Sequence, residues 1–325
     1  MPVWQEELRT AIRDPRRLCE ALGLPPEMAN GSEGPVAEFP VFVPASYLKR
    51  IEHGNPADPL FLQVWPAATE TVDADGFVDD PVDDAAFVLE PGLLKKYAGR
   101  ALMIVTGACA VHCRYCFRRH FPYSETPPSE TAWTGAIEAV RGDSSIEEII
   151  LSGGDPLTVT DARLASLAER FAAILHLRRL RIHTRLPVMI PSRVTDELLA
   201  WLTGTRLTPV MVIHANHAQE LDDEVASAID RLRMAGVMLL NQAVLLRDVN
   251  DSADAQAALS LRLIDLGVTP YYLHQLDRVR GAAHFEVSIA EGRAIVAELR
   301  RRLPGYAVPQ YVQEQPGAPH KMALC

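Results

Sequence analysis

The strongest constraint on the fold of this chain is an alternation of strand and helix patterns that begins at residue 100. The short apolar runs expected to form strands are 100–107, 146–153, 180–185, 208–215, 237–246 and 269–276. Amphipathic helical patterns separate them, among them 161–175, 194–204, 222–236 and 252–267. Such alternation forms a parallel sheet with right-handed crossovers. Because six repeats are fewer than the eight of a closed barrel, we predict an α/β fold built on an open, partial (β/α)6 barrel.

Residues 1–95 show a different pattern. Helical patches alternate there with connections rich in Pro and Asp, such as "GNPADP" and "DGFVDDPVDD". We therefore expect three parts in the chain. They are a mostly helical N-terminal region over 1–95, the partial barrel over 96–303 and a C-terminal segment over 304–325.

Composition narrows the class of protein. The 325 residues are 48% apolar and carry a formal charge of −10, and this acidity argues against nucleic acid or an anionic membrane as a partner. The N-terminus lacks the pattern of a signal peptide, and no apolar run reaches the roughly 18 residues of a membrane span. Three of the five cysteines lie within eight positions, which favours reduced thiols over disulfides. The sequence thus predicts a cytoplasmic protein.

Polar clusters follow the expected strands at the ends where α/β folds place their chemistry. A cysteine-containing loop follows the first strand, and "SGGDP" follows the second. "HTR" ends the third strand, "HANH" ends the fourth and "LDRVRGAAH" follows the sixth. Since the carboxyl ends of parallel strands share one edge of the sheet, these clusters predict a pocket on that rim.

The cysteines Cys109, Cys113 and Cys116 are spaced C-x3-C-x2-C, and this spacing leaves three possibilities open. A structural zinc site would need His112 or His120 as its fourth ligand. A redox-active pair could form from the C-x2-C part, but Cys109 would then have no role. A [4Fe–4S] cluster held by three cysteines would keep one iron open to a further ligand.

For the third possibility, a [4Fe–4S] cluster, the cysteine spacing and its position after the first strand resemble the radical S-adenosylmethionine superfamily. In that superfamily, three cysteines follow the first strand, with an aromatic residue such as Tyr115 before the last of them. The "SGGDP" turn resembles the superfamily's glycine-rich contact to the methionyl amino group, a close approach that the missing Cβ permits. The resemblance implies S-adenosylmethionine as a ligand and an external one-electron reductant. The residues expected to contact S-adenosylmethionine are Ser152, Gly153, Gly154, Asp155 and His214.

Longer motifs narrow the resemblance. "CRYCFRRHFPY", "RIHTRLPVMIPSRVT", "HANHAQE", "PYYLHQLDRVRGAAHF" and "PGAPHK" resemble the lysine 2,3-aminomutase family, from about residue 36 to the C-terminus. The pattern is nearest to the short branch of that family, which is linked to the (R)-β-lysylation of elongation factor P. Glu314 stands where the free-lysine branch typically has aspartate, and the chain stops four residues after Lys321, where that branch continues further.

The family resemblance implies an isomerase that converts L-α-lysine to (R)-β-lysine with pyridoxal phosphate (PLP). Lys321 matches the lysine that attaches PLP, although Met322 departs from the residue that usually follows it. Arg100 matches a contact to the PLP phosphate, for which a bidentate guanidinium is suited. Tyr97 and Gln242 match positions that line the cofactor.

The substrate residues are also implied by the resemblance. Arg118 matches the arginine that binds the α-carboxylate of lysine. Asp277 and Glu314 match the pair of carboxylates that binds the ε-ammonium, and an incoming cation would suit two buried carboxylates. The alternatives are that Lys321 is a solvated lysine near the chain end, and that the two carboxylates form surface salt bridges with Arg278 or Arg280.

Other functions stay open at this point. The aminomutase could act on free lysine in catabolism or osmolyte synthesis, or on glutamate, although Asp277 and Glu314 would repel a glutamate side chain. A protein of another class, a non-catalytic zinc-stabilised binding module, would use the cysteines alone. In the preferred interpretation the partners are L-lysine and, functionally, elongation factor P with its lysyl-tRNA synthetase-like ligase. The sequence leaves the oligomeric state open, a homo-oligomer included.

Overall fold

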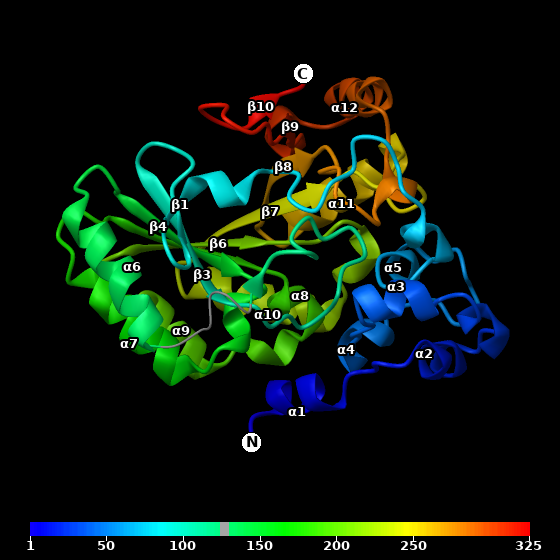
Figure 1. Cartoon of the computed structure of the whole chain (residues 1–325), viewed down its shortest axis with the longest axis horizontal. Coiled ribbons are helices and arrows are strands. Elements are labelled where there is room, and N and C mark those ends of the chain that lie inside the picture. Colours follow the sequence, from blue (N-terminus) through cyan, green and yellow to red (C-terminus); the bar gives the residue numbers. More distant parts are fainter. Residues whose placement is uncertain (124–129) are drawn as a thin grey trace.

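A ten-stranded sheet forms the centre of the protein, and its strands lie in chain order from β1 to β10 (Figure 1). The structure is a computed structural model that describes residues 1–123 and 130–325. Six neighbouring strands are parallel: β3 (Arg100–Thr106), β4 (Glu148–Gly153), β5 (Arg179–Thr184), β6 (Thr208–Ile213), β7 (Met238–Val244) and β8 (Thr269–His274). Each lies within or one residue from the position expected from the sequence, so the predicted α/β class and partial barrel are confirmed.

Helices connect the parallel strands and cover one side of the sheet (Figure 1). They are α6 (Glu130–Gly142), α7 (Asp161–Ala172), α8 (Leu186–Met189), α9 (Asp196–Thr203), α10 (Asp223–Met234), α11 (Ala253–Asp265) and α12 (Ile289–Arg302). Helix α10 shows why the amphipathic pattern in the sequence correctly predicts a helix. Asp222 caps its first turn by accepting a hydrogen bond from Val225 N, and its apolar positions recur at helical spacing on one buried face. Gly236, with a φ of +82°, allows the chain to leave the helix.

The sheet extends beyond the six predicted strands at both edges. The short strands β1 (Val88–Glu90) and β2 (Leu93–Leu94) form an antiparallel addition before β3. After α12, β9 (Gln310–Gln313) runs parallel to β8, and β10 (Met322–Ala323) returns antiparallel to β9. The C-terminal segment is therefore part of the sheet. Strands of two to four residues carry too few alternating positions to be recognised from the sequence.

The N-terminal region consists of short helices that share the core of the barrel. They are α1 (Val3–Thr10), α2 (Pro15–Leu22), α3 (Glu33–Glu38), α4 (Ala45–Leu48) and α5 (Pro59–Leu62). Trp4, Tyr47 and Phe61 are buried in one continuous apolar cluster with residues of β5 and α12 such as Ile182 and Leu299. The division of the chain into three parts stays a prediction. Among the described helices, none is both long and apolar enough to span a membrane.

Candidate active site

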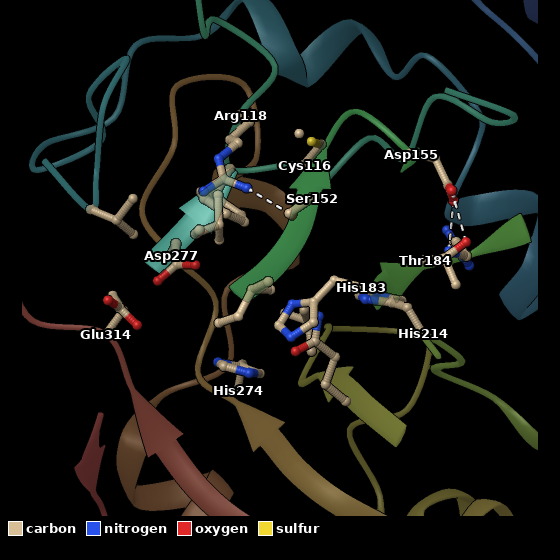
Figure 2. Close-up of a pocket in the computed structure, with 18 of the residues that line it drawn as sticks. Cys116, Arg118, Ser152, Asp155, His183, Thr184, His214, His274, Asp277 and Glu314 are labelled. Carbon is tan, nitrogen blue, oxygen red and sulfur yellow. Dashed lines mark hydrogen bonds between the residues drawn. The ribbon is translucent and has the colours of Figure 1, made fainter. Parts of the chain in front are cut away.

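A cavity of about 470 Å³ opens at the carboxyl ends of the parallel strands, and side chains from several strands point into it (Figure 2). Every residue that the sequence singled out for a cofactor or the substrate lines this cavity: Cys109, Cys113, Cys116, Ser152, Gly153, Gly154, Asp155, His214, Tyr97, Arg100, Gln242, Lys321, Arg118, Asp277 and Glu314. The individual roles assigned to them stay predictions.

The cysteine loop is held in place by the N-terminal region. Glu70, in the 3-10 turn η2 (Ala68–Thr71), accepts hydrogen bonds from Arg114 Nε at 2.8 Å and Arg114 Nη2 at 2.5 Å. Arg119 Nη2 donates to the same carboxylate at 2.8 Å. All three side chains are buried. Because the two arginines lie on either side of Cys116 in the sequence, this triad fixes the backbone that carries the cysteines.

The donor atoms of the loop fit an iron–sulfur cluster. Burial raises the pKa of the Cys109 thiol, and it raises that of Cys116 to about 11. Thiolates at these positions therefore need a cationic partner such as iron. His112 and His120 each have a ring nitrogen against a backbone carbonyl oxygen, at 2.7 and 3.2 Å. In the described part of the chain, no three His, Cys, Asp or Glu side chains form a group suited to a single metal ion.

The glycine-rich turn after β4 packs directly on the cysteine loop. Gly154 N donates to Thr106 O at 2.8 Å, and Asp155 N donates to Ala108 O at 2.7 Å. A Cβ on Gly154 would lie 2.4 Å from Ala108 O, and Gly153 has a φ of +119°. The sequence predicts these glycines for a close approach to a ligand. The structure shows that the backbone of the cysteine loop itself already requires them.

Asp155 connects the ends of β4 and β5. Its carboxylate accepts hydrogen bonds from Leu157 N at 3.0 Å, Thr184 Oγ1 at 2.7 Å and Arg185 N at 2.7 Å. Figure 2 shows this carboxylate beside Thr184. Burial raises the pKa of Asp155 to about 6, in opposition to these hydrogen bonds. The observed contacts make Asp155 a link within the fold, and its contact with S-adenosylmethionine stays a prediction.

Charged side chains form a connected network at another part of the cavity. Lys321 Nζ and Glu314 form an ion pair, and Tyr97 Oη donates to the same carboxylate at 2.5 Å. Lys96 Nζ lies 3.6 Å from Glu314 Oε1 and 3.1 Å from Asp84 Oδ1. Although burial opposes ionisation, the Lys321 ammonium and the hydrogen bonds lower the pKa of Glu314. Lys321 is therefore a cavity residue and not a solvated lysine.

The guanidinium of Arg118 lines the cavity and is paired with the carboxylate of Asp84. Its Nε donates to Asp84 Oδ2 at 2.8 Å, and its Nη1 donates to Ser152 Oγ at 3.3 Å (Figure 2). Asp84 lies in the 3-10 turn η3 (Asp84–Phe87), which precedes β1. Arg118 is thus partly neutralised and firmly oriented, and its remaining nitrogen faces no charged partner among the described residues.

Asp277 lies just after β8 and differs from Arg118, which is paired with a charged residue. Within the described ranges its carboxyl has no hydrogen bond and no ion pair, and it lines the cavity. Burial raises the pKa of Asp277 to about 7; the nearby Lys321 ammonium opposes this rise and the Glu314 carboxylate adds to it. The alternative of a surface salt bridge is wrong, because Arg278 pairs with Glu286 and Arg280 pairs with Asp79, each at 2.7 Å. Asp277 is a half-buried acceptor suited to a cation.

Polar groups without protein partners lie near Lys321. Arg100 stacks on the Tyr97 ring at 4.7 Å and forms no hydrogen bond or ion pair with another described residue. The Nε2 atoms of His183 and His274 are buried without a hydrogen-bond partner, and burial together with charges that include Lys321 lowers the pKa of both rings. A free guanidinium suits a phosphate dianion, and neutral imidazoles suit a polar heterocycle. This donor set fits PLP.

Comparison with known proteins identifies the family. A family model described as "4Fe-4S single cluster domain" matches residues 98–182, which include all three cysteines of the loop. L-lysine 2,3-aminomutase of Haemophilus influenzae is 46% identical over 98% of this chain and 94% of its own length. The enzyme of the same name from Escherichia coli is 46% identical over 99% and 94%, respectively. The chain belongs to the L-lysine 2,3-aminomutase family.

Membership of the L-lysine 2,3-aminomutase family confirms the predicted resemblance to radical S-adenosylmethionine enzymes and the prediction of an isomerase. The aminomutase of Clostridium subterminale is a more distant relative, 33% identical over 97% of this chain and 76% of its own length. A solved radical S-adenosylmethionine methyltransferase from Sphaerobacter thermophilus has a TM-score of 0.46 and 19% identity over 68% of each chain, a likeness too low to add to this assignment.

The sequence alone did not mark several residues that line the cavity. Asp84 and Lys96 lie in irregular segments between weak patterns, where no motif marked them. His183, Arg185 and His274 lie inside motifs that the sequence did single out, "HTR" and "YYLHQL". Their position at the carboxyl ends of β5 and β8 was the available signal.

Proposed function

We propose that this protein is a PLP-dependent radical S-adenosylmethionine aminomutase that converts L-α-lysine to (R)-β-lysine. One observation carries the proposal: a single cavity joins the three-cysteine loop to Lys321 and to two carboxylates, Asp277 and Glu314. The distance between the α-carboxylate and the ε-ammonium of an extended lysine is roughly 6–7 Å on the scale of backbone bonds. A substrate of this kind needs an anion-binding and a cation-binding end, and the cavity offers both.

The chemistry of the amino shift would come from the bound cofactors. When bound, the cluster with S-adenosylmethionine would remove and return one hydrogen atom, while PLP would hold the migrating nitrogen. Cys109, Cys113 and Cys116 would hold the cluster, and the neighbouring turn with Ser152, Gly153, Gly154 and Asp155, together with His214, would contact S-adenosylmethionine. The exchange of an amino group and a hydrogen between adjacent carbons is redox-neutral overall, although the cluster would need an external electron donor.

The protein's own residues would bind and orient the reactants. Lys321 would attach PLP through its amine, with the free guanidinium of Arg100 on the phosphate. Tyr97 and Gln242 would lie along the cofactor. Arg118 would use its remaining nitrogen for the substrate carboxylate, because Asp84 and Ser152 fix the other two.

The ε-ammonium of lysine would bind between Asp277 and Glu314. Asp277 has no cation of its own within the described ranges, and Glu314 is paired with the Lys321 ammonium. Attachment of PLP to Lys321 would use the amine that now pairs with Glu314. Glu314 would then keep only Lys96, 3.6 Å from its Oε1, as a cationic partner among the described residues, and Asp277 would have no ion pair there. A glutamate substrate would place a third carboxylate there, which argues against glutamate.

We propose further that the product serves the β-lysylation of elongation factor P through a lysyl-tRNA synthetase-like ligase in the cytoplasm. One observation favours this role over free-lysine metabolism: the chain has Glu314 in place of the aspartate typical of the free-lysine branch.

The experiment is turnover under anaerobic, reducing conditions after reconstitution with iron, sulfide and PLP. L-lysine, L-ornithine, L-glutamate and L-alanine are compared for the wild type and for Cys116→Ala. We expect only the wild type to form β-lysine. The wild type should bind about four irons per chain, and Cys116→Ala should not retain them. Preference for glutamate would overturn the lysine assignment. A protein that takes up zinc in place of iron and sulfide would instead be the binding module considered from the sequence.

A further inference from the structure

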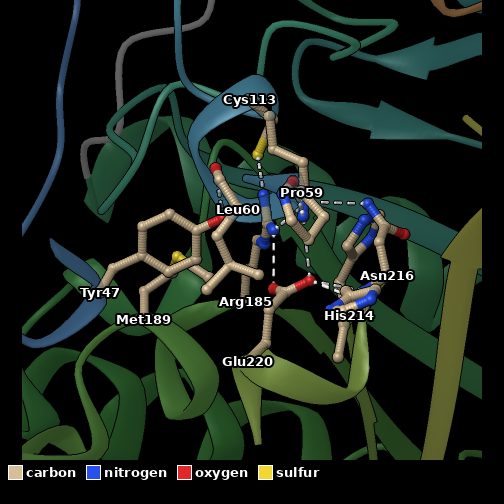
Figure 3. Close-up of polar contacts among 12 residues, drawn as sticks. Tyr47, Pro59, Leu60, Cys113, Arg185, Met189, His214, Asn216 and Glu220 are labelled. Carbon is tan, nitrogen blue, oxygen red and sulfur yellow. Dashed lines mark hydrogen bonds and ion pairs between the residues drawn. The ribbon is translucent and has the colours of Figure 1, made fainter. Parts of the chain in front are cut away.

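Arg185 lies between a cysteine of the loop and a buried carboxylate (Figure 3). Its Nη1 donates to Cys113 Sγ at 2.7 Å. Its Nη2 donates to Glu220 Oε2 at 2.8 Å and to Gln63 Oε1 at 2.7 Å. Among the described residues, no other side chain donates a hydrogen bond to a cysteine of the loop. The contact distinguishes Cys113 from Cys109 and Cys116.

The guanidinium cannot easily move from this position. Arg185 N donates to Asp155 Oδ2 at 2.7 Å, which fixes the backbone. The guanidinium carbon lies 5.8 Å from the centre of the Tyr47 ring and 5.7 Å from that of Tyr115. The side chain of Arg185 is 7% exposed and that of Glu220 is 0% exposed. Water therefore screens this charge little, and its effect on the neighbouring sulfur is strong.

Glu220 is itself held by several donors. It lies in the 3-10 turn η7 (Ala218–Glu220) after β6, and its Oε1 accepts hydrogen bonds from Asn216 N at 2.8 Å and His217 N at 3.0 Å. Gln63 is positioned by Asn216, whose Nδ2 donates to Gln63 Oε1 at 3.0 Å. The partners of Arg185 thus come from three separate elements, and this arrangement holds one nitrogen of the guanidinium on Cys113.

We propose that Arg185 is a positioning residue that raises the reduction potential of the cluster held by Cys109, Cys113 and Cys116. Hydrogen bonds to the sulfur ligands are among the factors that set the potential of an iron–sulfur cluster. Reduction adds one negative charge to the cluster, and a positive donor on a ligand sulfur stabilises the reduced form more than the oxidised form. Glu220 holds the donor and offsets part of its charge. The inference rests on the cluster of the proposed function.

The test separates the hydrogen bond from the net charge. Arg185→Met alone would leave Glu220 buried and unpaired, so the main variant is Arg185→Met with Glu220→Gln, which removes both charges of the pair. The reconstituted cluster is titrated with a reductant and its potential is followed by electron paramagnetic resonance. We expect the equilibrium constant for one-electron reduction of the cluster to be at least about tenfold smaller in the double variant than in the wild type. This corresponds to a reduction potential that is lower by about 59 mV.

Two further variants keep the outcome interpretable. Arg185→Lys retains a positive donor, so its potential should lie between those of the wild type and the double variant. Arg193→Met with Asp161→Asn is the matched control, because it removes another arginine–carboxylate pair, at 2.8 Å, in which the arginine is buried and which does not line the cavity. Its potential should equal that of the wild type.

Iron content and reduction potential together distinguish a wrong cluster assignment from a wrong role of Arg185. If the wild type takes up no iron and sulfide, the cluster assignment itself is wrong. If the wild type and the variants hold the same iron content, a wild-type potential in the double variant overturns the role of Arg185. If the double variant fails to fold, the potentials of Glu220→Gln and Arg185→Lys decide the question. Wild-type potentials in both would overturn the role of Arg185, because neither the carboxylate paired with Arg185 nor the several N–H donors of its guanidinium would then affect the cluster.

Discussion

Glu314 and Lys321 face one another at the base of a hairpin, and their side chains form an ion pair inside the cavity. The pairing of Met322 with Gln313 in β9 and β10 brings them together, since these two residues are the next pair along the hairpin. The ammonium of Lys321 therefore lies beside the carboxylate that we propose for the ammonium of the substrate. If Lys321 is attached to PLP, its amine no longer occupies the position beside Glu314, and the ammonium of the substrate can bind there.

Lys321→Ala should abolish covalent attachment of PLP and leave iron content unchanged, because Lys321 and the cysteines lie on separate segments. Borohydride reduction followed by peptide mapping locates the attached group. Lys95→Ala is the control, since Lys95 pairs with Asp143 outside the cavity. A pyridoxyl group found on Lys95 or Lys96 of the wild type would contradict the assignment.

The affinity for L-lysine should rise with pH up to about neutrality. Burial raises the pKa of Asp277 to about 7 although the Lys321 ammonium opposes the rise. With Lys321 attached to PLP the pKa of Asp277 should be no lower than this, so below neutrality a proton competes with the substrate ammonium. Only the ionised carboxylate attracts the cation, and affinity should fall by up to about tenfold for each pH unit below 7. Lysine binding to the PLP-loaded enzyme, measured by the change in cofactor absorbance between pH 6 and 8, checks this dependence.

Asp277→Asn provides the matching variant. We expect it to lose the pH dependence together with about 2–5 kcal/mol of interaction with the substrate cation, which is roughly 30- to 4,000-fold in catalytic efficiency. PLP and iron content should stay at wild-type levels. An Asp277→Asn enzyme that binds lysine as tightly as the wild type at every pH would remove Asp277 from the ammonium site.

Glu70→Gln should lower the free energy of unfolding by about 3–5 kcal/mol, because it leaves the buried guanidiniums of Arg114 and Arg119 without a negative partner. Chemical denaturation under anaerobic conditions measures this change. Glu138→Gln is the control, since Glu138 and Arg141 form an exposed pair, and it should cost less than about 1 kcal/mol. Equal effects of the two substitutions would mean that the triad does not stabilise the loop.

Gly154→Ala should damage the cysteine loop. The added Cβ would lie 2.4 Å from Ala108 O, a backbone atom that cannot turn away, and overpacking of this kind costs about 1–3 kcal/mol. We expect a lower iron content after reconstitution and a lower unfolding midpoint. Gly305→Ala is the control, because a Cβ there meets open space. Wild-type iron content in Gly154→Ala would show that the two loops can separate without loss of the cluster.

The sequence predicted the parts of this protein that repeat. The six strands and the helices between them have clear periods, and the polar residues at their ends share one rim because parallel strands end at one edge. The contacts that orient these residues were not predictable. Glu70 and Arg114 are 44 positions apart, and Asp84 and Arg118 are 34 apart. In each pair the carboxylate lies in an irregular connection, where no periodic pattern indicates its neighbours.

The position of Lys321 and Glu314 on the last hairpin of the sheet has a consequence for assembly of the protein during synthesis. The cysteine loop and Glu70 lie in the first part of the chain, and β9 and β10 come last. The loop can therefore dock on the N-terminal region well before the far wall of the cavity exists. Its last charged residues arrive only when β9 pairs with β8. A chain that stops short of this hairpin would retain the cysteines and Asp277 but would lack Glu314 and Lys321, the residues proposed for the substrate ammonium and for PLP.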